Sequence, residues 1–393
     1  MTPDPAPLPL RTTLALGLVT FLLMLPETLP VPVLRGLVVE RFQVGADLAS
    51  IFMSANMVGA LLAAPWIGKL ARRTGARRRL ALTAMLLDAV AMQALAHPLD
   101  YGSFLALRTL EGALHISALT LLMSLVADAA GSRRGSALGC LGAGLTLGVA
   151  AGAALGGQFG KDDPLQTLHV ASAVLATAFA LSTWLLPREA APARNAADHG
   201  LLAAWRRAPA ARTPLLIAFV DRFTVGFFTT GFPLLLPSST PEEKARIGML
   251  LGAFLFPFAL LSWPFGRAAE KWSRVAMVVI GSAVYGAGVM AIGIVPVETM
   301  WLLMPVLGVS SAVMFVPSLL WLLERAPDFD RTTAMAAFHG AGSLGFLLGP
   351  VCCGQLIALG GTEGGVGYTL AFGVAGLAEI AAAALVLLGS RRR

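Results

Sequence analysis

A succession of long apolar segments constrains this chain more than any other feature of its sequence. An α-helix needs about 20 mainly apolar residues to cross the hydrocarbon core of a bilayer. Only 13% of the 393 residues are charged, about half of what a soluble protein carries. The pattern predicts an all-α, multi-pass membrane protein. Its twelve expected transmembrane helices are residues 12–34, 48–67, 80–97, 103–127, 135–158, 167–186, 214–236, 247–265, 275–295, 300–323, 334–359 and 368–389.

The basic residues predict how these helices are oriented, because short loops rich in Lys and Arg stay in the cytoplasm. With the N-terminus inside, 22 of the 29 basic residues fall in cytoplasmic segments, five in outer loops and two inside helices. Both termini are therefore expected in the cytoplasm, and the plasma (inner) membrane of a bacterium is the expected location. The first apolar run continues into a proline-rich segment without a small-residue cleavage site, which favours a retained helix over a signal peptide.

Other classes of protein fit the sequence poorly. The net charge of +7 comes from basic residues in short loops, which argues against a nucleic-acid-binding surface. Cys140, Cys352 and Cys353 lie in apolar segments without the spacing of a metal site. The phosphate-loop pattern Gly-x-x-x-x-Gly-Lys-Ser/Thr does not occur in the sequence. We therefore expect no enzymatic activity, no metal and no cofactor.

The sequence repeats itself on the two sides of its longest polar stretch, residues 187–213. Basic segments follow the second and eighth apolar stretches at an offset of 198 residues, and glycine-rich faces recur at about 201. Two halves in parallel repetition are typical of one large group of transporters. We expect an N-terminal six-helix half (1–186), a cytoplasmic linker (187–213) and a C-terminal six-helix half (214–393). Residues 199–207 form either a short amphipathic helix on the membrane surface or an ordinary basic linker.

The basic loop after the second apolar stretch, residues 68–80, carries a recognisable motif. It reads Gly-Lys-Leu-Ala-Arg-Arg-Thr-Gly-Ala-Arg-Arg-Arg-Leu. Through Gly68, Arg73 and Gly75, among others, it resembles the motif Gly-x-Leu-Ala-Asp-Arg-x-Gly-Arg-Arg-x-x-Leu of the major facilitator superfamily. Arg72 stands where the family has an Asp that helps to latch the cytoplasmic side. The corresponding segment of the second half begins at Gly266 and supplies an acid, Glu270.

This resemblance extends over essentially the whole chain and implies the fold of the major facilitator superfamily, with two six-helix halves. The fifth apolar stretch resembles the family's antiporter motif at Gly144, Gly148, Gly152 and Leu155, although Val149 replaces a proline. Glycines four residues apart let two helices approach closely. They indicate either a sliding contact between the halves or plain small-residue packing. The eleventh stretch repeats this glycine face with Gly345, Gly349 and Pro350.

Ionisable residues inside the predicted helices are the candidates for transport chemistry, because a charge at the bilayer centre costs about 2.5–3.5 kcal/mol. The resemblance implies that helices 1, 4, 7 and 10 line a central cavity. Residues spaced i, i+3 and i+7 share one helical face, as do Arg108, Glu111 and His115 on helix 4. The candidates are Glu27, Asp88, Arg108, Glu111, His115, Asp221, Arg222, His339 and Glu379.

Glu27 is the first candidate for a proton-carrying residue. Three prolines between residues 26 and 32 are expected to break the first helix and turn its free carbonyl groups to the cavity. Counted by helical rise, Glu27 and Arg108 come out at similar depth. A buried acid beside an Arg can hold or release a proton. We expect Glu27, Arg108 and Glu111 to couple transport to protons; the alternatives are a structural Arg108–Glu111 pair and a water-exposed Glu27.

The remaining candidates receive less specific roles. Asp221 and His339 are expected to form an inner gate, or else a structural cluster at the cytoplasmic rim. Asp88 and Glu379 fall on helices 3 and 12, which the resemblance places at the periphery, so a structural role is expected for both. The substrate cavity is expected to be lined by His115, Asp221, Arg222 and Phe228, although aromatic residues at helical spacing also serve as plain packing.

Taken together, these features predict a monomeric secondary transporter that moves a small molecule across the membrane by alternating access. The antiporter motif favours proton-driven export of drug-like or amphipathic compounds, and the resemblance implies the drug:proton antiporter branch. Two alternatives remain open: proton-coupled symport of a sugar, organic anion or other nutrient, and lipid flipping. The expected partners are the substrate, protons and the lipid bilayer, with no nucleic acid.

Overall fold

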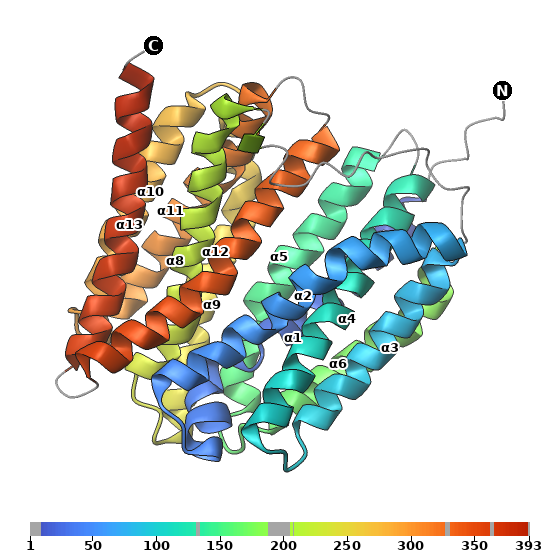
Figure 1. Cartoon of the computed structure of the whole chain (residues 1–393), viewed down its shortest axis with the longest axis horizontal. Helices are drawn as coiled ribbons and strands as arrows, with labels where there is room; N and C mark the ends of the chain where they lie inside the picture. Colours follow the sequence, from blue (N-terminus) through green and yellow to red (C-terminus); the bar gives the residue numbers. More distant parts are fainter. Residues whose placement is uncertain are drawn as a thin grey trace. The chain divides into compact units, whose positions relative to one another are not determined.

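The computed structural model describes residues 9–130, 134–187, 205–206, 208–326, 331–361 and 365–391. Within these residues twelve helices of 19 residues or more follow one another, joined by turns and short connections (Figure 1). They are α1 (Leu10–Thr28), α2 (Ala46–Thr74), α3 (Arg77–Leu95), α4 (Tyr101–Ala129), α5 (Arg134–Phe159), α6 (Gln166–Leu185), α8 (Arg212–Leu235), α9 (Pro241–Ala268), α10 (Arg274–Ile292), α11 (Met300–Arg325), α12 (Arg331–Gly360) and α13 (Val366–Arg391).

Each predicted apolar span overlaps one of these helices. Eleven of them are long and apolar enough to cross a membrane by length and composition. The helix that falls short is α3, because it carries three consecutive arginines from Arg77 and an internal acid, Asp88. The possible linker helix over residues 199–207 lies almost wholly outside the described residues.

The first helix ends where prolines remove backbone donors. Pro26 is accommodated inside α1, which continues to Thr28. A short 3₁₀ helix (Val31–Val33) and a π-helical stretch (Arg35–Glu40) then lead towards α2. Proline lacks the N–H that an α-helix needs at interior positions, so the chain leaves the α-helical form after Thr28, one residue beyond Glu27.

The chain divides into two compact units. The described residues of unit 1 lie within Met1–Leu37, Ala55–Arg194 and Ser238–Met249, and those of unit 2 within Val38–Ser54, Asn195–Pro237 and Leu250–Arg393. The first residues of α2 therefore belong to unit 2, and the first residues of α9 to unit 1.

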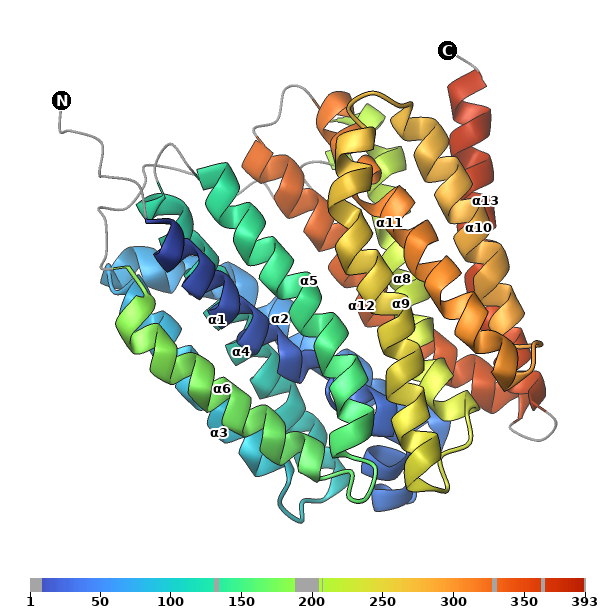
Figure 2. The ribbon, with the colours of Figure 1, turned by 180° about the vertical axis from the view of Figure 1, so that it is seen from behind.

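In unit 1, α5 packs closely along α1, as Figures 1 and 2 both show. Gly144, Gly148 and Gly152 face the carbonyl oxygens of Gly17, Phe21 and Leu25 on α1, so closely that a Cβ atom would meet each oxygen. These contacts lie within one unit, whereas the sequence left open a sliding contact between the halves or plain small-residue packing. They hold two helices of one unit together, because backbone can approach backbone where side chains are absent.

Unit 2 repeats this arrangement with α12 and α8. Gly345 and Gly349 face the carbonyl oxygens of Phe219 and Phe223, and the ring of Pro350 lies against Gly226. The repeat that the sequence predicts in the glycine spacing is thus a repeat of helix pairs.

Ion pairs recur at matching places in the two units. In unit 1, Arg77 at the start of α3 lies 2.6 Å from Asp128 near the end of α4. In unit 2, Arg274 at the start of α10 binds Glu324 near the end of α11. Between α2 and α3, Gly75 adopts a left-handed backbone (φ 60°) that a residue without Cβ enters freely. The basic loop is therefore a tight turn followed at once by an ion pair.

The start of α4 is fixed by a side-chain cap. Asp100 accepts hydrogen bonds from the backbone N–H of Ser103 at 3.0 Å and from its hydroxyl at 2.5 Å. These bonds favour the ionised acid and hold the pKa of Asp100 below its usual range. An anionic cap suits a helix N-terminus, and it sets the register of the helix that carries Arg108, Glu111 and His115.

Candidate functional site

Six polar side chains from four helices meet inside unit 1, and we call them the N-terminal polar cluster. Glu27 comes from α1, and α2 and α3 supply one residue each. The side chains of five members are almost fully buried, and that of Glu27 is 18% exposed. The cluster consists of Glu27, Asn56, Asp88, Arg108, Glu111 and His115.

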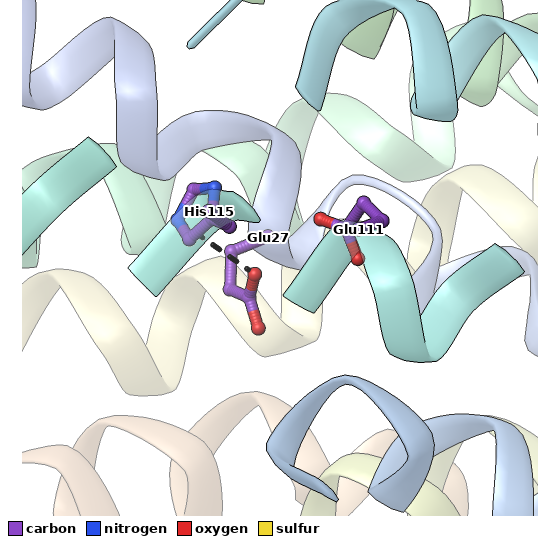
Figure 3. Close-up of side chains that lie close together, drawn as sticks. All are labelled: Glu27, Glu111 and His115. Carbon is purple, nitrogen blue, oxygen red and sulfur yellow. Dashed lines mark ion pairs between the residues drawn. The ribbon is translucent and has the colours of Figure 1, made fainter. Parts of the chain in front are cut away.

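His115 links two acids of the cluster. Its Nδ1 lies 3.0 Å from Oδ2 of Asp88, and its Nε2 lies 3.9 Å from Oε2 of Glu27 (Figure 3). Nε2 has no hydrogen-bond partner among the described residues. A carboxylate on one ring nitrogen fixes the orientation of the imidazole and favours its protonation, so the other nitrogen is presented to Glu27.

Glu27 is held by α2 as well as facing α4. The side-chain amide of Asn56 donates a hydrogen bond of 2.5 Å to Oε1 of Glu27. On the opposite side α5 supports the end of α1: the hydroxyl of Thr28 donates to the carbonyl oxygen of Val149 at 2.7 Å. Glu27 therefore occupies a fixed position and is the most exposed acid of the cluster.

Arg108 and Glu111 form a buried ion pair on α4. The guanidinium Nη1 lies 2.5 Å from Oε2 of Glu111, and the two residues are 2% and 0% exposed. The second oxygen of Glu111 has no hydrogen-bond partner within the described part of the chain. The pair thus neutralises one acid and leaves one carboxyl oxygen facing the rest of the cluster.

The cluster contains more acids than cations. Three carboxyl groups, those of Glu27, Asp88 and Glu111, face one permanent cation, Arg108, and one titratable base, His115. If all three acids were ionised, the cluster would carry a net negative charge even with His115 protonated. Uncompensated charge away from water is costly, so the arrangement favours the uptake of protons.

Three residues of the cluster also carry groups that could ligate a metal ion. Ligand atoms of Glu27, Glu111 and His115 lie within 4.8 Å of one another. Carboxylate and imidazole groups suit divalent transition metals, but Arg108 already occupies one oxygen of Glu111. A dication would have to sit beside this guanidinium, so the group fits protons better than a metal.

Two members of the cluster were not predicted as functional residues. Asp88 was expected at the periphery with a structural role, but it is completely buried and binds His115. Asn56 was not singled out. Spacing along one helix brings together Arg108, Glu111 and His115, but contacts between α3 and α4 or between α1 and α2 leave no periodic signal in a single sequence.

The candidates of unit 2 lie as follows. Oδ2 of Asp221 is 3.4 Å from the guanidinium of Arg222, which lies 4.5 Å from the centre of the Phe315 ring. His339 is exposed on α12. Phe228 is 1% exposed and packs against the Phe254 ring, with their ring centres 4.8 Å apart. The inner gate and the substrate-lining role of these residues remain predictions.

In the loop motifs that begin at Gly68 and Gly266, charged side chains are exposed to solvent. Arg73 is exposed at the end of α2, and Glu270 is exposed after α9. Gly68 lies in α2, as does the backbone of Arg72, whose side chain is outside the described set. Gly266 packs against the side chain of Val316 on α11. The asymmetric latch expected from Arg72 and Glu270 likewise remains a prediction.

Membrane-spanning helices in a repeated arrangement, with charges buried in their midst, define a polytopic membrane transporter rather than an enzyme. The sequence matches the family model described as Major Facilitator Superfamily over residues 16–241 and 214–393. The chain belongs to this family, and its fold is that of twelve transmembrane helices in two six-helix halves. Its general function is therefore secondary transport of a small molecule across a membrane.

Solved structures with the same fold come from transporters of different substrates. The nucleoside transporter NupG is 12% identical, with a TM-score of 0.78 over 96% of this chain and 99% of that protein. A bacterial homologue of the human lysosomal transporter Spinster is 15% identical, with a TM-score of 0.77 over 97% and 96%. A D-xylose–proton symporter is 14% identical, with a TM-score of 0.76 over 95% and 96%. A comparison with curated protein sequences gave no match. At these identities the likeness establishes the fold alone.

Proposed function

We propose that this protein is a proton-coupled secondary transporter that exports drug-like or amphipathic small molecules by alternating access. The observation that carries the proposal is the N-terminal polar cluster, in which two buried carboxyl groups and the partly buried Glu27 face one arginine and one histidine. Such a cluster binds a proton when it is closed off from water and releases it when water enters. Intramembrane ionisable groups of this kind serve as proton relays in transporters.

Glu27 is the proposed proton carrier, and the other residues set its properties. Asn56 donates a hydrogen bond to one carboxyl oxygen of Glu27, and His115 lies 3.9 Å from the other. Both residues therefore interact differently with the charged and the neutral form of Glu27. Asp88 orients His115, and Glu111 balances Arg108. Glu27 also sits at the end of α1 that α5 supports through Thr28 and Val149. A tilt of α1 against α5 would change the access of water to Glu27.

The direction of transport rests on the α5 motif. Gly144, Gly148 and Gly152 pack against α1, the helix of the proposed carrier. In this arrangement the residues that resemble an antiporter motif are mechanically connected to the proton site, which favours export. Symport remains the second candidate, because a D-xylose–proton symporter shares the fold.

A reconstituted system with an imposed pH gradient distinguishes the two directions. Purified protein in liposomes is screened with labelled amphipathic cations, sugars, nucleosides and organic anions. An antiporter concentrates its substrate in the acidic compartment, because protons leave that compartment as substrate enters. A symporter concentrates its substrate in the alkaline compartment. This sign does not depend on how the protein is inserted, and accumulation in the alkaline compartment would contradict export.

The first prediction concerns Glu27→Gln. This variant keeps the size and hydrogen-bonding capacity of the side chain but cannot release a proton, so pH-driven accumulation should be abolished while substrate exchange without a gradient persists. The matched control is Glu298→Gln, which neutralises an exposed acid between α10 and α11 and should transport like the wild type. Accumulation by Glu27→Gln would exclude Glu27, and the same loss from Glu111→Gln alone would move the proton site to Glu111.

A further inference from the structure

Unit 2 contains a buried acid that the proposed function does not use. Glu379 lies near the middle of α13 and is 0% exposed. Neither of its carboxyl oxygens has a hydrogen-bond partner of good geometry within the described residues. Two hydroxyls lie beside Glu379: that of Ser282 donates to the sulfur of Met314 at 3.3 Å, and that of Thr224 donates to the carbonyl oxygen of Ala375 at 3.4 Å. Each can still accept a hydrogen bond from a protonated carboxyl group.

A second acid and a phenol complete this buried site. Asp221 lies on α8 one turn before Thr224, whose hydroxyl bonds to Ala375 of α13, and Tyr285 lies on α10 next to Gly286. Both are buried, and Oδ1 of Asp221 and the hydroxyl of Tyr285 also have no hydrogen-bond partner among the described atoms. Gly286 allows this approach of α10 and α13, because a Cβ there would lie 2.9 Å from Cβ of Glu379. Three buried polar side chains from three helices thus lie in the region where α8, α10 and α13 pack together.

The charges around Asp221 and Glu379 favour a state in which one carboxyl group is ionised and the other carries a proton. The permanent cation in reach is Arg222, which lies 3.4 Å from Asp221 and is 25% exposed. Arg222 packs against Gly342 of α12, the helix that also carries His339; from α11, the contact with Arg222 is the apolar ring of Phe315. One ionised carboxylate balances Arg222, and a second would be an unpaired charge in an apolar interior, which is unfavourable.

We propose that Asp221, Glu379 and Tyr285 form a second proton-binding site, in which the two carboxyl groups share one exchangeable proton. Asp221 is the ionised partner of Arg222, and Glu379 carries the proton as a neutral acid. Tyr285 can donate a hydrogen bond to either carboxyl group. The site resembles carboxyl pairs in which neighbouring acids do not ionise together. It is separate from the N-terminal polar cluster and does not depend on the role of Glu27.

Infrared difference spectroscopy of the purified full-length protein tests this site, because a protonated carboxyl group has a C=O stretch that a carboxylate lacks. At neutral pH, the wild type minus Glu379→Gln spectrum should contain such a band, and the band should shift in D₂O. Asp221→Asn should remove the band as well, because Glu379 then ionises to balance Arg222. If Glu379→Gln fails to fold, Glu379→Asp retains the carboxyl group and should shift the band.

Two controls keep this test independent of the proposed function. Glu27→Gln and Glu298→Gln should each leave the Glu379 band in place, whatever they do to transport. A neutral-pH difference spectrum without the band would show that Glu379 is ionised and would overturn the proposal. A band that survives Asp221→Asn would contradict the shared proton, and a band insensitive to D₂O would contradict its exchange.

Discussion

At the scale of single residues, the pair of Asp88 and His115 decides how the N-terminal polar cluster behaves. Asp88 is 0% exposed, and its Oδ2 lies 3.0 Å from Nδ1 of His115. A buried donor that loses its acceptor costs about 1–3 kcal/mol. Asp88 is therefore a positioning residue, which acts on Glu27 through the imidazole of His115.

The second prediction follows from this contact. Asp88→Ala should lower the stability of the purified protein by about 1–3 kcal/mol, measured by thermal or denaturant unfolding in detergent. Asp88→Asn retains an acceptor for Nδ1, so it should unfold closer to the wild type. Because it removes the charge that favours the imidazolium, its transport profile should move to lower pH. Asp162→Ala, at an exposed acid in the turn between α5 and α6, is the control; equal stability of the two alanine variants would contradict a buried contact.

At this scale the sequence predicted the residues that α1 and α4 contribute to the N-terminal polar cluster. The spacing of Arg108, Glu111 and His115 placed them on one helical face, and proline chemistry drew attention to Glu27. The roles of Asp88 and Asn56 were missed, because they depend on which helices are neighbours. That information lies in contacts between segments and not in the periodicity of any one segment.

At the scale of elements, the glycine face of α5 determines where α1 lies. The Cβ of an alanine at position 148 would meet the carbonyl oxygen of Phe21, whereas the space around Gly142 on the same helix is open. The sequence predicted close helix packing from the four-residue spacing. It left the partner of this glycine face open, because glycine spacing describes one surface and not the surface that covers it.

The third prediction uses these two glycines as a matched pair. Gly148→Ala should destabilise the protein by about 1–3 kcal/mol, because α1 must move away from α5. Gly142→Ala should stabilise it by up to about 1 kcal/mol, because alanine favours the helix and meets no neighbour. Thermal unfolding of the two variants shows directly which is less stable and which is more stable than the wild type. Equal effects of the two substitutions would show that α1 does not rest on this face.

At the scale of the whole molecule, twelve apolar spans and their charge bias predicted the fold class, because the length of a helix and the position of basic loops are properties of single segments. The low hydropathy of α3 did not obscure this prediction, since its charges lie near one end apart from Asp88. The sequence did not predict the substrate, because proteins that share this fold transport different molecules.

The fourth prediction concerns orientation. In a variant without Cys140, Cys352 and Cys353, a single cysteine introduced by Asp163→Cys should react with an impermeant thiol reagent added to intact cells. One introduced by Thr74→Cys should react only after the membrane is opened, because the basic segment beside it stays in the cytoplasm. Labelling of the Thr74→Cys protein from outside would reverse the proposed orientation.

The Arg108–Glu111 ion pair is buried, so dissolved ions around the protein do not screen it. Dissolved ions screen charges that are in contact with water, over about 8 Å at physiological ionic strength. Glu324, the partner of Arg274, is 54% exposed, so this pair weakens as salt concentration rises. Arg108 and Glu111 are 2% and 0% exposed, and dissolved ions do not come between them. Changes in external salinity therefore act on the rim of the protein and leave the energetics of this buried pair unchanged.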